Sequence, residues 1–195
     1  MRSAVVFLLT VLCATAARAD EPLIDAAARG DKLAAQQLIA SGASVDVRGA
    51  DNATALIVAA LSGEEDIARL LIAKGANVKA RNAGGFTALH AAAYQGSVPV
   101  VALLLDNNAP RDDAENKAGV TPVFVAAEMN HPDVIELLVS RGADISKPES
   151  HGYSAMTRAF WKGNKEVVSL LKQYGQTCQQ DKLTQTEYAQ CLEIK

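Results

Sequence analysis

The sequence lacks the features that several common functions require. There is no excess of basic residues, because 19 Lys and Arg stand against 22 Asp and Glu, a formal net charge of -3. A surface that binds nucleic acid needs a basic patch to replace the counterions around the phosphates. The mildly acidic balance therefore argues against nucleic acid as a partner.

Motifs for catalysis, cofactors and metals are also missing. The chain has no G-x-G-x-x-G or P-loop pattern, and no nucleophile is marked by a motif. Its three histidines, His90, His131 and His151, lack the H-x-x-x-H or C-x-x-C spacing of a metal site. Gly84 and Gly85 fit a tight hairpin turn better than a phosphate loop. We expect no catalytic residue, no metal and no cofactor, and so no enzyme.

The one long apolar run lies at the N-terminus. Residues 1–19 begin with Arg2, continue with an apolar run over 4–13 and end with Ala17-Arg18-Ala19, the pattern of a cleaved secretory signal peptide. The run is too short for a membrane span, which takes about 20 apolar residues. No other segment is long and apolar enough, so we expect no membrane span.

Cleavage before Asp20 would leave 17 basic and 22 acidic residues, a net charge of -5. Lipidation at Cys13 is an alternative, but Leu12 precedes it, and lipoprotein signals favour a small residue at that place. We therefore expect a cleaved chain in the periplasm of a bacterium with two membranes.

What the sequence does contain is a repeat with a period of about 33 residues. Three sets of landmarks recur at spacings of 33 or 34, and three independent landmarks keep one period by chance only very rarely. The sets are Thr54, Thr87, Thr121 and Ser154; Gly30, Gly63, Gly96, Asn130 and Gly163; and Gly42, Gly75, Asn108, Gly142 and Gly175.

The motifs within this period resemble the ankyrin repeat. Residues Thr87-Ala88-Leu89-His90-Ala91-Ala92-Ala93 are similar to its Thr-Pro-Leu-His-x-Ala-Ala motif, and Gly142-Ala143-Asp144 to its Gly-Ala-Asp/Asn mark. The resemblance implies an all-α fold, a solenoid of about five helix-turn-helix repeats with β-hairpin loops, to which we add a C-terminal capping helix. The expected repeats lie in a domain over 20–177, at about 21–48, 49–81, 82–115, 116–148 and 149–177.

The tail, residues 178–195, falls outside the period. Thr184 and Glu187 have the spacing of a capping box, which predicts a short helix over about 185–193. Cys178 and Cys191 are the two cysteines left after cleavage, an even number in an oxidising compartment. They are expected to form a disulfide, with two free thiols as the alternative.

One connection between repeats contains an extra residue. Thr121 lies 13 positions after Asn108, whereas Thr87 lies 12 positions after Gly75. The insertion lies within 109–120, in a highly charged loop. It is either a tolerated loop insertion or a contact built for a partner.

Candidate partner-binding residues come from the positions that ankyrin repeats use for contacts, the hairpin tips and the ends of the first helices. They are Phe86, Tyr94, Lys117, Val120, Met129, His151, Tyr153 and Trp161. The chain has only nine aromatic residues, and Phe86, Tyr94, Tyr153 and Trp161 are all expected on one exposed, concave side. A strip of exposed aromatics is costly unless it binds something. For Tyr153 and Trp161 the alternative is packing under the tail.

The expected function is thus protein binding in the periplasm. Two roles fit, an immunity or inhibitor protein that blocks a toxin, and an accessory protein for an exported enzyme. The alternative is a structural or stabilising protein of the cell envelope without a discrete ligand.

Overall fold

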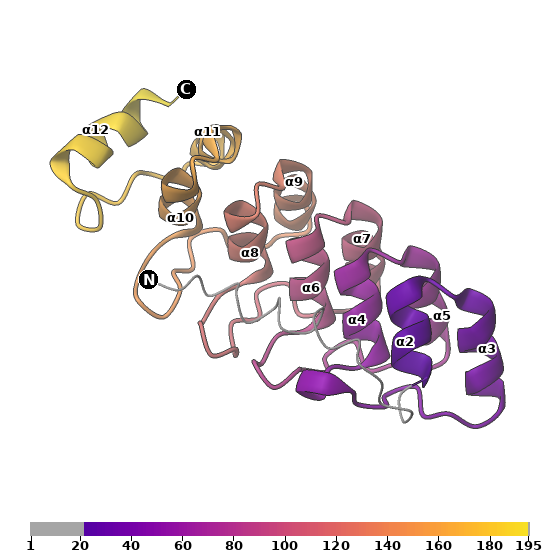
Figure 1. Cartoon of the computed structure of the whole chain (residues 1–195). Coiled ribbons are helices and arrows are strands. Elements are labelled where there is room, and N and C mark those ends of the chain that lie inside the picture. The colour runs from indigo at the N-terminus through magenta and orange to yellow at the C-terminus, as the bar shows by residue number, and fades with distance from the viewer. Residues whose placement is uncertain (1–21, 195) are drawn as a thin grey trace. The chain divides into compact units, whose positions relative to one another are not determined.

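A computed structural model describes residues 22–194 (Figure 1). The helices in this range are eleven α-helices and one short 3-10 helix, and the range contains no β-strand, so the expected all-α fold is confirmed. The proposed signal peptide lies outside the described residues. The chain divides into two compact units, the first ending at Pro110 and the second beginning at Arg111.

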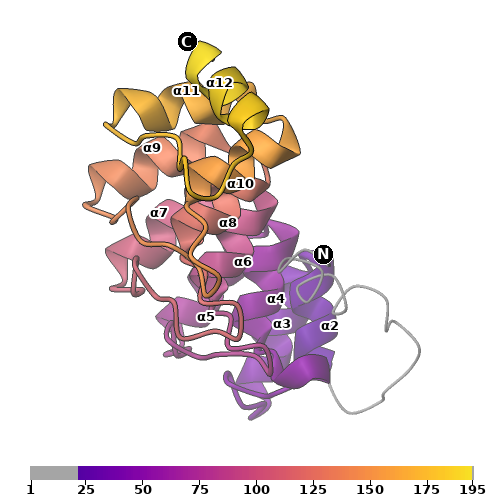
Figure 2. The same ribbon diagram turned by 90° about the vertical axis from the view of Figure 1, so that its left-hand side faces the viewer.

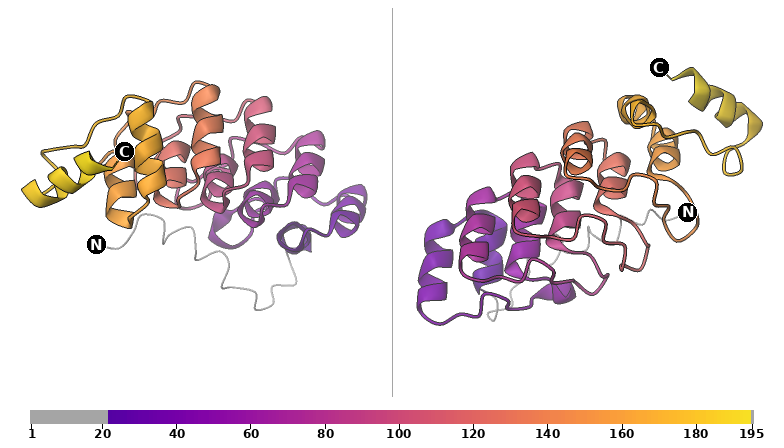
Figure 3. Two further views of the ribbon diagram at one scale, coloured as in Figure 1. Left: turned by 90° about the horizontal axis from the view of Figure 1, so that it is seen from above. Right: turned by 180° about the vertical axis from the view of Figure 1, so that it is seen from behind.

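The first unit is a double layer of short helices. One layer holds α2 (Pro22–Arg29), α4 (Ala55–Ser62) and α6 (Ala88–Gln95), and each of these helices packs against the next. The other layer holds α3 (Lys32–Ala40), α5 (Glu65–Ala73) and α7 (Val98–Asp106) in the same order. The 3-10 helix η1 (Ala50–Asn52) lies in the loop before α4 (Figures 1 and 3).

The second unit repeats this arrangement and adds a tail. Helix α8 (Pro122–Glu128) packs against α10 (Ala155–Lys162), and α9 (Pro132–Ser140) against α11 (Lys165–Gln173). The tail helix α12 spans Gln185–Glu193, the residues predicted from the capping box (Figure 2). No helix within 22–194 is long and apolar enough to cross a membrane.

The recurring landmarks explain where the helices begin and end. The hydroxyls of Thr54, Thr121 and Ser154 each accept a hydrogen bond from the backbone N–H three residues later, so each caps a helix. Asn108 has a positive φ of 62°, as expected for the asparagine that replaces the recurring glycine. Small side chains, such as the buried Ala92, let the helices of the first layer approach closely.

Candidate functional site

The hairpins before α6, α8 and α10 are each braced by one buried polar side chain. In the first unit, Asn82 Oδ1 accepts hydrogen bonds from the backbone N–H groups of Gly84 (3.0 Å) and Phe86 (2.9 Å). In the second unit, Asn116 Oδ1 accepts from Ala118 (3.2 Å) and Val120 (3.1 Å) in the same way. Both asparagines are buried, so each loop has a defined conformation.

The fifth repeat uses Glu149 for the same task. Its Oε1 accepts from the backbone N–H groups of His151 (2.8 Å) and Tyr153 (3.2 Å), and its Oε2 lies 2.9 Å from Nδ1 of His151. Burial alone would raise the pKa of this carboxylate. The hydrogen bonds from the His151 side chain and from the backbone N–H groups of Tyr153 and His151 have the larger combined effect, so the net result is a pKa of Glu149 below its usual value.

Neighbouring tips within each unit are also joined to each other. The backbone N–H of Ala83 donates to the carbonyl oxygen of Asp51 (2.7 Å), and that of Ser150 donates to Ala118 (3.1 Å). The Asn82 side chain adds a bond to Asp51 Oδ2 of 2.9 Å. A partner would therefore meet a surface that is already ordered, which lowers the entropic cost of binding.

Six of the eight candidate binding residues are at least partly exposed, and four of these do not belong to the aromatic pair that lies against the tail. Lys117 and His151 are exposed on their hairpins, while Tyr94, in the last turn of α6, and Met129, at the end of α8, are partly exposed. We call these four, together with Asp51, Ala83, Gln95, Ala118 and Ser150, the tip residues of their respective units. All nine are at least partly exposed.

The prediction of a binding role is wrong for two residues, Phe86 and Val120. Phe86 is 3% exposed and Val120 is 1% exposed, so neither can contact a partner without unfolding. Each directly precedes the N-cap threonine of a first helix, Thr87 or Thr121. An apolar residue at that position commonly packs back on the helix, as in the hydrophobic staple. Ala53, before Thr54, is also buried.

Tyr153 and Trp161 lie against the tail, as the alternative interpretation held. Their rings meet edge-on, with centroids 4.9 Å apart. Lys182 Nζ, from the tail, lies 5.5 Å from the centroid of the Tyr153 ring. Hydrogen bonds from Thr184, with a smaller contribution from the nearby Trp161 side chain, hold the pKa of Glu187 in α12 below its usual value. Both aromatic residues remain partly exposed.

Gln179 fastens the tail to the fifth repeat. Its Oε1 accepts from Ser154 N (2.7 Å) and Thr157 Oγ1 (2.6 Å), and its Nε2 donates to the carbonyl oxygen of Gly152 (3.0 Å). Thr157 stands at the histidine position of the repeat motif, so this departure from the motif serves the tail. The sequence did not predict these contacts of Gln179, because a residue outside the repeats has no equivalent position in them that would indicate its role.

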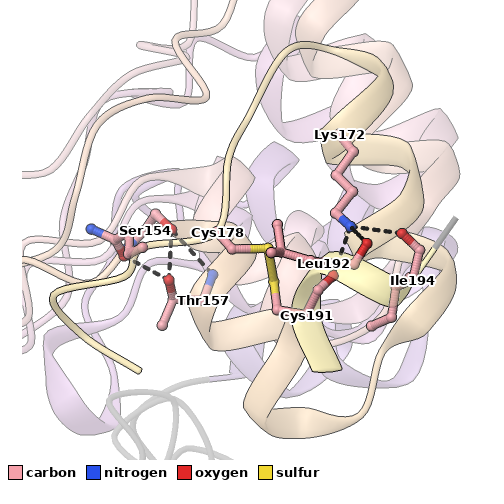
Figure 4. The surroundings of a disulfide bond; sticks show 8 residues. Ser154, Thr157, Lys172, Cys178, Cys191, Leu192 and Ile194 are labelled. Atoms are coloured by element: carbon pink, nitrogen blue, oxygen red, sulfur yellow. Dashed lines mark hydrogen bonds between the residues drawn. A yellow bond between two sulfur atoms is a disulfide. The ribbon is translucent and has the colours of Figure 1, made fainter. Parts of the chain in front are cut away.

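A disulfide and a lysine hold the end of the tail. Cys178 and Cys191 form the disulfide predicted from the sequence, and both residues are buried (Figure 4). Lys172 Nζ donates to the carbonyl oxygens of Cys191 (2.6 Å), Leu192 (3.1 Å) and Ile194 (2.6 Å). A cation at this end of α12 also complements the helix dipole.

The charged loop with the extra residue makes contacts within the second unit. Asp112 Oδ1 accepts from the backbone N–H of Asp144 (2.7 Å), and Arg111 Nε donates to the carbonyl oxygen of Gly142 (3.0 Å). In the first unit Asp46 accepts from Asn77 N (3.0 Å) in the equivalent way. Asp112 therefore keeps the regular register, and the extra residue lies within 113–115.

The part of the chain that the structure describes holds no group of three or more His, Cys, Asp or Glu side chains that could bind a metal ion. Its polar side chains instead brace loops, cap helices and fasten the tail. Such an arrangement defines an ordered surface for binding.

Comparison with known proteins identifies the family. The family model for ankyrin repeats (3 copies) matches residues 23–113 and 108–182, so the chain belongs to the ankyrin-repeat family. Ankyrin repeats are protein–protein interaction modules.

The chain is also similar to part of two curated proteins. One is "Ankyrin repeat and SAM domain-containing protein 6" of Mus musculus, 41% identical over 61 residues, and the other is its Rattus norvegicus counterpart, 39% identical over 61 residues. Each match covers 31% of this chain and 7% of the relative.

Proposed function

We propose that this protein is exported to the periplasm and binds a protein partner there through the tip residues of its repeats. The observation that carries the proposal is the bracing of the hairpins. Asn82, Asn116 and Glu149 each fix two backbone N–H groups from inside the loop while the tips stay accessible. The buried side chains thus fix the loop conformations, and the exposed tip residues remain available to contact a partner.

The tail supports the same proposal by limiting where a partner can bind. It engages Tyr153 and Trp161, which stand at the contact positions of the fifth repeat. Because both rings remain partly exposed, a partner can reach the second unit at its hairpin tips, such as Lys117 and Ser150, and at the exposed parts of Tyr153 and Trp161. The tail serves as a cap, which the last unit of a repeat array requires.

A pull-down from periplasmic extract tests partner binding. The bait is the chain without residues 1–19, and captured proteins are identified by mass spectrometry. Matched baits carry Ala83→Arg, which blocks a tip, or Lys165→Ala, an exposed change on α11. A partner that is lost with Ala83→Arg but kept with Lys165→Ala supports the proposal. If no protein shows this pattern, the structural role in the envelope becomes the better account.

Export is tested separately, by N-terminal sequencing of the protein from fractionated cells. A chain that begins at Asp20 in the periplasmic fraction is expected. An intact Met1 in the cytosolic fraction would exclude export. The partner's identity then separates the two roles, because a toxin indicates immunity or inhibition and an envelope enzyme indicates support.

A further inference from the structure

The fifth repeat places a cation where the three repeats before it have small apolar side chains. Arg158 occupies the repeat position of Val58, Ala91 and Val125, at spacings of 33 or 34. Those three residues are buried, whereas Arg158 is partly exposed. Lys162 follows four residues later and is exposed, so the two cations share one face of α10.

The Arg158 guanidinium is held in position without an anionic partner. Its Cζ lies 5.9 Å from the centroid of the Phe124 ring in α8, a cation–π contact. Its Nε is buried and donates to no acceptor among residues 22–194. The donors that another molecule can reach are therefore the terminal Nη groups, whose planar fork matches a carboxylate.

Lys162 differs from Arg158 because its charge is already balanced. Its Nζ lies 3.5 Å from Oε1 of Glu128, whose side chain is 0% exposed. A buried carboxylate favours a nearby cation, so Glu128 keeps Lys162 close to α8. No ion pair within residues 22–194 involves Arg158, so its guanidinium charge is not paired there.

The surroundings of Arg158 suit a protein ligand. Trp161 lies three residues on from Arg158, on the same side of α10, and meets Tyr153 edge-on. Aromatic rings beside an arginine are typical of the few residues that contribute most to protein–protein affinity. A polyphosphate carries several negative charges, which one arginine beside the Glu128 carboxylate does not balance, so a single carboxylate fits this site better.

We propose that Arg158 binds a carboxylate of an acidic segment of the protein partner, with Lys162 flanking the carboxylate and the Tyr153–Trp161 pair contacting the apolar residues beside it. This inference rests on the proposed function and extends it, because it assigns the partner's chemistry. The partner would approach α8 and α10 beside the tail, without displacing it.

A library of short random peptides, displayed and selected against the oxidised chain without residues 1–19, provides the probe. Selected peptides are synthesised with each Asp or Glu in turn changed to its amide. Their affinities are measured by fluorescence anisotropy for the wild type, Arg158→Gln and the matched control Lys165→Gln, an exposed lysine on α11. Circular dichroism confirms that each variant is folded.

We expect Arg158→Gln to weaken binding about tenfold or more, since a charge-assisted hydrogen bond is lost. One acid-to-amide change in the peptide should give the same loss. The two changes together should cost no more than either alone, because they remove the same contact. Lys165→Gln should leave the affinity within about twofold.

The inference is overturned if peptides that respond to Lys117→Ala, a tip variant of the same unit, bind Arg158→Gln as tightly as the wild type. In that case binding at the tip residues stands and only the carboxylate site fails. If the bound peptides respond to none of these substitutions, the proposed function itself fails. If inorganic phosphate displaces the peptides from the wild type but not from Arg158→Gln, the site is a phosphate site and the carboxylate inference is wrong.

Discussion

The ring of Phe86 meets the ring of His90 edge-on, with centroids 5.6 Å apart and planes inclined by 81°. Both residues are buried, and His90 Nδ1 lies 2.9 Å from the hydroxyl of Thr87, the N-cap of α6. Phe86 thus packs against the first turn of α6 and stabilises the start of that helix. It belongs to the core of the first unit.

Phe86→Ala should therefore lower stability by about 3–5 kcal/mol, the usual range for a buried phenylalanine. Tyr94→Ala, which alters a partly exposed ring, should cost much less. Urea unfolding followed by circular dichroism measures both. Equal losses for the two variants would contradict the placement of Phe86 in the core.

Glu149 should make the second unit sensitive to acid. Its folded-state pKa is lowered, so its contribution is fully present above the ordinary glutamate pKa of about 4.3 and is lost as the pH falls through the folded value. Glu149→Gln, which keeps an acceptor but removes the charge, should be less stable than the wild type at neutral pH. The difference should shrink as the solution is acidified below about pH 4.

Glu166→Gln, on the exposed side of α11, is the matched control for that titration. Glu149→Ala should be the more damaging change, by about 1–3 kcal/mol, because it leaves two backbone N–H groups without their acceptor. A stability difference between wild type and Glu149→Gln that persists unchanged in acid would refute the role of the charge.

The disulfide should control the docking of the tail. Replacing Cys178 and Cys191 by serine is expected to lower the stability of the tail by about 3 kcal/mol, the typical value for a short closed loop. Trp161 is the only tryptophan, and its ring meets that of Tyr153, which Lys182 of the tail also contacts, so its fluorescence reports on the tail. Reduction should shift the emission to the red in the wild type and leave the double serine variant unchanged.

Gln179 provides an independent test of tail docking, with its neighbour as control. Gln179→Ala removes three hydrogen bonds to the fifth repeat and should cost about 2–3 kcal/mol. Gln180→Ala, at an exposed position, should be nearly neutral. Hydrogen exchange should show faster opening of α12 in the first variant only. Similar exchange in both would show that the disulfide and Lys172 suffice to hold the tail.

Much of the fold could be predicted from the period alone. The landmarks that recur at 33 or 34 residues mark helix caps and left-handed turns, and these features are local, so sequence spacing reports them directly. The tail helix was predictable for the same reason, since Thr184 and Glu187 do form the capping box. The brace residues Asn82, Asn116 and Glu149 keep the same spacing, and alignment of the repeats could have revealed them.

The errors and omissions have a different origin. The repeat pattern predicts Phe86 and Val120 at the surface, because their positions lie near hairpin tips, but the direction of a side chain depends on the packing beneath the loop. The contacts of Gln179 and Lys182 join the tail to segments about 20 to 30 residues away, and no short-range pattern encodes such contacts. The placement of Arg158 over Phe124 likewise depends on how two helices pack.

Binding of the captured partner to single-site variants tests the central claim most directly. Isothermal titration calorimetry would compare the wild type with Tyr94→Ala, Lys117→Ala and the control Lys165→Ala. The account predicts that Tyr94→Ala weakens binding by about 2 kcal/mol, that Lys117→Ala weakens it by a smaller amount and that the control binds as the wild type does. If both tip variants bind normally while the α11 variant fails, the partner binds the layer of second helices and the account is wrong.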